Sequence, residues 1–154
     1  MTTNPTTHTA AQLAALAPRE LDALAAVIVL DCTVYDEELY WSTMETVCRL
    51  PDGLKLRDWS FSTSRDAAAL LEAELALRGL EDERIEQLCG VVDITWYHRH
   101  SKHQLARLSS ASAKARTIAA ILAVQDSPYL QIVTWDKHPK DAANSQSASD
   151  LPAA

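Results

Sequence analysis

The feature that most limits the possible folds is the stretch from Trp59 to Leu75, in which an extended aromatic segment turns directly into an amphipathic helix. Hydroxyl side chains mark the turn, because Ser62, Thr63 or Ser64 can accept a hydrogen bond from a free backbone N–H group and cap the helix. Thr63 and Asp66 also have capping-box spacing, with Asp in place of Glu. We expect a buried stripe of Ala67, Leu70, Leu71 and Leu75. Gly79 is expected to end the helix.

Length and composition indicate one small domain. The chain has 154 residues, and residues 1–8 and 140–154 lack hydrophobic periodicity, so we expect flexible tails on a single domain formed by residues 9–139. The net charge of −7 argues against a protein that coats nucleic acid or binds an anionic membrane. Three widely spaced cysteines, and the absence of an apolar run of about 20 residues, favour the cytoplasm.

The first half of the chain predicts a helix and a hairpin. Pro18 suits the first position of a helix, and Glu20 in the first turn favours the positive end of the helix dipole. Residues 47–50 and 54–60 flank a Pro-Asp-Gly turn sequence, which predicts a β-hairpin. The acidic run between these elements, residues 31–46, leaves its fold open.

The second half predicts two strands and a helix. Alternating side chains indicate a strand over residues 88–98 and an antiparallel return over 104–108. A serine among residues 109–112 then caps an alanine-rich helix that ends near Asp126, and residues 129–135 can add an edge strand. The expected fold class is α+β, an α/β/α sandwich with a mostly antiparallel sheet of about three to five strands and about three main helices.

Three segments carry a family resemblance. Residues 16–24 look like an opening helix, residues 61–69 like a central strand-to-helix turn, and residues 113–124 like a closing helix. Together they resemble the phage ABA sandwich domain family, small proteins of bacteriophages and prophages, over roughly residues 10–125. The resemblance implies a phage or prophage origin, an antiparallel sheet between helices and a place in the bacterial cytoplasm. It implies no activity and no functional residues.

Histidines form the densest chemical cluster. His98 and His100 stand at alternate positions of the predicted strand, so their imidazoles can face the same way. Together with His103 they are candidate ligands of Zn²⁺ or Ni²⁺. A closed site needs about four ligands, and no second cluster lies nearby in the sequence. A polar, solvated hairpin tip is therefore favoured over a metal site.

A basic zone spans residues 94–125, which contain no acidic side chain. Cations near the amino end of the alanine-rich helix predicted after residues 109–112 are slightly unfavourable, unless an anion such as a phosphate or nucleotide binds there. A solvated face that balances the acidic remainder of the protein is the favoured alternative. The candidate anion-binding residues are Arg99, Lys102, Arg107, Lys114 and Arg116.

The acidic run is the other candidate surface. Aromatic side chains among carboxylates suit a basic protein partner, including a nucleic-acid enzyme whose substrate the surface imitates. The alternative is an acidic loop whose aromatic side chains anchor the core. The candidate protein-binding residues are Asp36, Glu37, Glu38, Tyr40 and Trp41.

No combination of residues predicts catalysis. The sequence shows no recognisable catalytic set of nucleophile, base and orienting group. The chain has only three glycines, and they form no phosphate-binding or dinucleotide-binding motif. We therefore expect a non-enzymatic phage or prophage accessory protein, without cofactor, that binds a host or phage protein, for example to inhibit a host defence or nucleic-acid enzyme. The alternative is a nucleotide- or nucleic-acid-binding module that uses the basic 94–125 zone.

Overall fold

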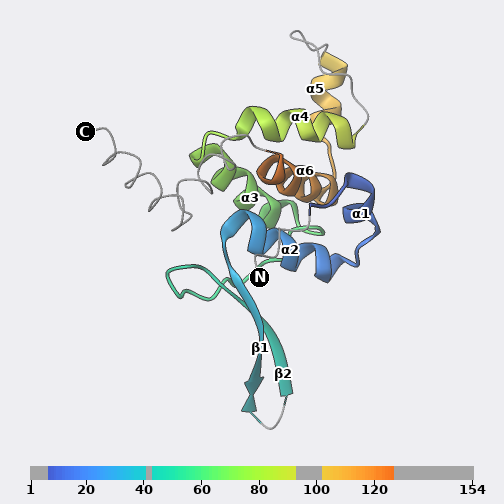
Figure 1. The fold of residues 1–154 in the computed structure, drawn as a ribbon. Helices are drawn as coiled ribbons and strands as arrows, with labels where there is room; N and C mark the ends of the chain where they lie inside the picture. Colours follow the sequence, from blue (N-terminus) through green and yellow to red (C-terminus); the bar gives the residue numbers. More distant parts are fainter. Residues whose placement is uncertain (1–6, 41–42, 93–101, 127–154) are drawn as a thin grey trace, which may run out of the picture.

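The computed structural model describes residues 7–40, 43–92 and 102–126 (Figure 1). Within these ranges the chain forms six helices and one antiparallel pair of strands, which confirms the α+β class. The described residues do not show the expected sandwich, because their sheet has two strands and the helices pack on one another. The elements are α1 (Ala10–Ala15), α2 (Pro18–Leu30), β1 (Thr33–Leu39), β2 (Thr43–Arg49), α3 (Arg65–Leu77), α4 (Glu81–Val91), α5 (Lys102–Ser109) and α6 (Ala113–Gln125).

Helix α6 lies at the centre of the helical part of the molecule, and α1, α2, α3 and α4 pack around it (Figure 1). It begins where the sequence predicts, because the Ser112 hydroxyl oxygen accepts a hydrogen bond from the N–H of Ala115 at 3.1 Å. Every residue of α6 from Thr117 to Val124 is buried, so the predicted apolar stripe is only part of its buried surface. Its many alanines let the surrounding helices approach closely.

The aromatic segment before α3 is held between α2 and α6. Phe61 is fully buried, and the Thr117 hydroxyl lies 2.8 Å from the Phe61 carbonyl oxygen. On the other side, the backbone N–H of Ser62 donates to the buried carboxylate of Asp22 at 2.7 Å. These two bonds satisfy one carbonyl oxygen and one N–H of a buried turn, which would otherwise be costly to remove from water.

Helix α3 has the predicted position with two differences. Its cap is Ser64, whose hydroxyl oxygen accepts from the N–H of Ala67 at 3.2 Å, so the Thr63–Asp66 capping box does not form. Leu70 is 45% exposed, so its predicted burial is wrong. Gly79 follows the helix with φ +74°, a backbone conformation that glycine adopts without strain, as predicted.

Two predicted strands are helical where the structure describes them. Residues 88–91 belong to α4. Acidic side chains in the first turn of this helix favour its start. Its buried residues Leu88 and Cys89 are consecutive, which a strand with one buried face would not allow. Residues 104–108 lie inside α5. Alternation over a few residues was therefore a misleading signal. Residues 93–101 and the predicted edge strand 129–135 lie outside the described residues.

The first half of the chain follows its local signals more closely. Pro18 is the first residue of α2, and the N–H of Ala17 donates to Glu20 at 3.2 Å. The sequence reading missed α1, which a capping box between Thr9 and Gln12 begins. The last residue of the predicted tail, His8, donates its N–H to the Gln125 side chain at 3.1 Å. None of the described helices is long and apolar enough to cross a membrane.

The acidic run forms the hairpin of β1 and β2, which extends away from the helices (Figure 1). The hairpin predicted around the Pro-Asp-Gly sequence is present only as a turn, with Gly53 at φ +91° and one bridge between Arg49 and Lys55. Its return segment leaves β2 after Leu56 and runs to the core as the aromatic segment described above.

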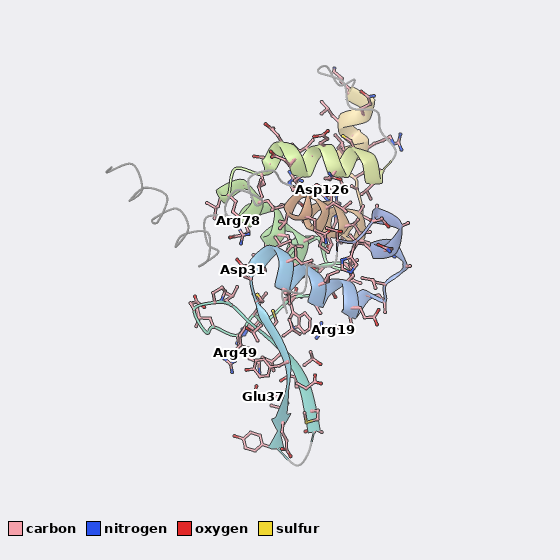
Figure 2. All side chains as sticks on the ribbon, viewed as in Figure 1. Arg19, Asp31, Glu37, Arg49, Arg78 and Asp126 are labelled. Carbon is pink, nitrogen blue, oxygen red and sulfur yellow. The ribbon has the colours of Figure 1, made fainter. Side chains whose placement is uncertain are left out.

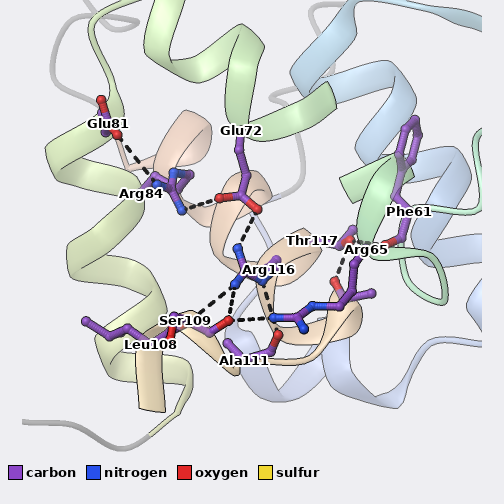
Figure 3. A network of polar contacts seen from close by, with 11 residues as sticks. Phe61, Arg65, Glu72, Glu81, Arg84, Leu108, Ser109, Ala111, Arg116 and Thr117 are labelled. Atoms are coloured by element: carbon purple, nitrogen blue, oxygen red, sulfur yellow. Dashed lines mark hydrogen bonds and ion pairs between the residues drawn. The ribbon is translucent and has the colours of Figure 1, made fainter. Parts of the chain in front are cut away.

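A polar network ties α3, α4 and α6 together (Figure 3). The Glu72 carboxylate accepts from Arg116 at 2.8 Å and from Arg84 at 2.7 Å, one arginine on each oxygen. Arg116 also donates to the carbonyl oxygens of Ser109 at 2.7 Å and Ala111 at 3.1 Å, which close the turn between α5 and α6. The side chains of Glu72, Arg84 and Arg116 are largely buried. Each charge is therefore stabilised by its partners in the network and would be costly to leave unpaired.

Arg116→Met should therefore destabilise the protein by about 2–3 kcal/mol, because it leaves one oxygen of the Glu72 carboxylate and two carbonyl groups without their donor. Urea unfolding followed by circular dichroism measures the change. Arg57→Met, at an exposed position, is the control and should change the unfolding free energy by less than about 0.5 kcal/mol. Equal losses for the two variants would contradict a structural role for Arg116.

Candidate functional site

The candidate site is the acidic hairpin, defined as residues 33–49, and its base is fixed to the helical core. Asp31 ends α2 in the left-handed conformation at φ 54°, and its carboxylate pairs with Arg78 at 3.2 Å (Figure 2). The next N–H, of Cys32, donates to the carbonyl oxygen of Ala26 at 3.0 Å. Cys32, just before β1, and Cys48 of β2 are both buried in the core cluster. The strands therefore leave the core in a fixed direction.

The buried thiols have no catalytic arrangement. Burial, and next a hydrogen bond with Cys48, raises the pKa of Cys32 to about 12. Burial also raises the pKa values of Cys48 and Cys89. Because the thiolate is the reactive form, burial and the raised pKa values both disfavour reaction of these thiols. They pack as small apolar side chains.

One face of the acidic hairpin carries charges that cancel. Glu37 and Glu45 lie directly opposite each other in the ladder, an unfavourable pairing of like charges. The Lys55 ammonium group reaches both, at 3.6 Å from Glu37 and 3.3 Å from Glu45. Arg49 adds a contact of 3.8 Å to Glu37 and donates to the Tyr35 hydroxyl oxygen (Figure 2). This face is therefore close to neutral.

The opposite face keeps its negative charge. Asp36 accepts a hydrogen bond from the Thr46 hydroxyl at 2.8 Å, which leaves the charge in place. Glu38 lies opposite Met44 and is exposed, and none of the described residues forms an ion pair with either carboxylate. The ladder thus separates the three consecutive acidic residues, with Glu37 on the neutral face and Asp36 and Glu38 on the charged face.

The tip of the acidic hairpin is apolar and open. Tyr40 is 88% exposed and Met44 62% exposed, and Leu39 is also exposed. The alternative in which the aromatic side chains anchor the core does not hold for Tyr40. Trp41, the other predicted aromatic contact, lies outside the described residues. The tip therefore combines exposed apolar side chains with the carboxylates that precede it.

Most of the described candidate anion-binding residues form contacts inside the protein. Arg116 belongs to the network with Glu72, Lys114 donates to the Ala14 carbonyl oxygen at 2.7 Å, and Arg107 donates to that of Val92 at 2.8 Å. Lys102 is exposed at the start of α5. Arg99 lies outside the described residues. Three of these cations thus have a structural use that the sequence did not reveal.

The histidine cluster is not described. His98, His100 and the side chain of His103 lie outside the described part of the chain, so the metal-site hypothesis stays a prediction. Within the described part, no group of three or more His, Cys, Asp or Glu side chains could hold a metal ion.

A cavity of about 420 Å³ lies on the β2 side of the acidic hairpin, where the return segment diverges toward the core. Its lining carries Arg19, Lys55 and Arg57 together with Glu45, and Lys55 is paired with Glu45. The Arg19 guanidinium lies 3.5 Å from the centre of the Trp59 ring. Sequence reasoning missed this cavity.

Lys55→Met should loosen the outer half of the acidic hairpin by about 0.5–1 kcal/mol, because Glu37 and Glu45 would then face each other without a cation between them. Amide hydrogen exchange at residues 36–46 measures the loss. Lys55→Arg is the matched control and should retain protection, and high salt should reduce the effect of Lys55→Met by screening the repulsion. Unchanged exchange in Lys55→Met would contradict this role.

The buried thiols should not react with a colorimetric disulfide reagent at pH 8 in the native protein, whereas all three should react in concentrated urea. The raised pKa values and burial both slow the reaction. A thiol that reacts in the native protein as fast as free cysteine would contradict the burial of the hairpin base.

No protein-family model, curated protein or solved structure matches this chain. The resemblance to the phage ABA sandwich domain family therefore stays a prediction from the sequence.

Proposed function

We propose that this protein is a non-enzymatic accessory protein of a phage or prophage that acts by binding another protein through the acidic hairpin. The observation that carries the proposal is the position of Asp36, Glu38 and Tyr40, which the core holds outward on a projecting pair of strands. The exposed charge at Glu38 and the apolar tip offer contacts that the described part of the chain does not use.

The chemistry of the acidic hairpin favours a basic partner. Carboxylates on an exposed ribbon attract positively charged surfaces over about a Debye length and raise association rates. Exposed Tyr40, Leu39 and Met44 can supply the apolar contacts that charge alone lacks. A host defence enzyme or another enzyme of nucleic acids has the required basic surface, and occupation of that surface would inhibit it.

The nucleotide- or nucleic-acid-binding alternative has less support from the described residues. It needs several free cations, and Arg116 is paired with the Glu72 carboxylate. Arg107 and Lys114 keep their charge, but each donates to a backbone carbonyl oxygen of this protein. Displacing Arg116 would also leave Glu72 with one partner fewer in a largely buried network.

Charge reversal on the acidic hairpin tests the proposal. Glu37→Lys with Glu38→Lys should weaken binding to the captured partner at least about tenfold, because like charges at an interface cost several kcal/mol. Immobilised protein captures partners from host lysate, and calorimetry with the purified partner measures the affinity. Glu38→Lys alone, which leaves the ion pairs of Glu37 in place, separates loss of charge from loss of hairpin structure.

The matched control is Asp82→Lys with Glu86→Lys, which makes the same change of net charge at exposed positions of α4. It should retain the partner. If the hairpin variant and the control bind the partner equally well, the acidic hairpin is not the binding surface.

A further inference from the structure

No described residue pairs with the outer edge of β1, and the hydrogen bonds of β2 show which backbone groups lie on that edge. Leu56 donates its N–H to the carbonyl oxygen of Cys48 at 2.8 Å, so Cys48 directs its backbone groups away from β1. In an antiparallel pair, the N–H and C=O of one residue point to the same side, and this side alternates along the strand. The ladder partner of Cys48, Val34, must therefore direct its own groups outward from β1.

The same alternation places the groups of Asp36 and Glu38 on the outer edge of β1, because they are the next two alternate residues. None of the described residues forms a hydrogen bond to the backbone of these residues on that edge. The edge of β2 is different, because residues 54–56 cover part of it. An open strand edge is a template for another extended segment.

Charge selects the segment that fits this edge. The side chains of Asp36 and Glu38 project on one face beside the open backbone groups, while Tyr35 and Leu39 are the exposed apolar side chains of the other face. A second copy of β1 would place carboxylates beside carboxylates, which is unfavourable. A segment with lysine or arginine at alternate positions, and apolar side chains between them, would match both faces.

We propose that β1 binds an extended, basic segment of the partner protein as an added antiparallel strand, with its cations beside Asp36 and Glu38. This inference rests on the proposed function and specifies how the partner is recognised. Backbone hydrogen bonds supply affinity, and the alternation of cations and apolar side chains supplies specificity.

A synthetic peptide of alternating lysine and valine, blocked at both ends, is the probe. Calorimetry with the full chain should show binding, and amide hydrogen exchange should slow at Val34, Asp36 and Glu38 while it stays unchanged at Met44 and Thr46. In an added strand, lysines that share a face with Asp36 also direct their N–H groups toward β1. Methylation of the lysine amides should therefore reduce affinity at least about tenfold, the loss of about 1.4 kcal/mol or more.

The matched control peptide carries the same number of methyl groups on the valine amides, whose N–H groups point away from β1. It should keep the affinity of the unmodified peptide within about a factor of three. Equal affinity of the two methylated peptides would show binding by charge alone, which overturns strand addition and leaves the proposed function intact.

Two other results would also overturn strand addition. One is a failure of the unmodified peptide to bind at millimolar concentration. If the natural partner still binds the control variant more tightly than the charge-reversed hairpin, the proposed function stands while strand addition fails. The other is a stable dimer in sedimentation at neutral pH whose protected amides are those of Val34, Asp36 and Glu38, because a second copy would then occupy the edge.

Discussion

The packing of other helices around α6 is the constraint on which the rest of the structure depends. A helix buried on all sides over Thr117–Val124 must satisfy every polar group inside the protein. The Thr117 hydroxyl binds the segment before α3, and Arg116 joins α3 and α4 through Glu72. The larger side chains that fill the core come from α6 itself, as Ile121 does, and from the surrounding helices, as Leu13, Leu21 and Leu71 do.

This core has consequences for the acidic hairpin, which lies outside it. A pair of strands is marginally stable by itself, so the hairpin relies on its buried base at Cys32 and Cys48 and on Lys55 between Glu37 and Glu45. The outer part of β1 and the exposed tip add little to the core. The described chain thus combines a packed helical body with a projecting charged ribbon, an arrangement that can present a binding surface without disturbing the core.

Local signals predicted the helices with clear starts and ends. Ser112 and Pro18 mark α6 and α2 because a cap or a fixed φ acts within one turn of chain. The failures fall on short alternating stretches. Residues 88–91 and 104–108 read as strands, yet they are helical, because a few alternating side chains fit either structure until the neighbours decide which face is buried. Of the hairpin strands, the sequence predicted only the end of β2, because charge masks the alternation of β1 and of the outer part of β2.

The sequence by itself determined the α+β class, the starts of α3 and α6 within a few residues, and the concentration of Asp36, Glu37, Glu38 and Tyr40 in one segment. Only the tertiary structure decided which hydroxyl groups form the caps, that this segment is exposed, and which charges remain free. Lys55, ten residues along the chain from Glu45, neutralises one face of the hairpin, and Glu72 holds Arg116, which the sequence offers as an anion ligand. Pairing between charges depends on distances that chain folding sets, so composition alone cannot show which charges have partners.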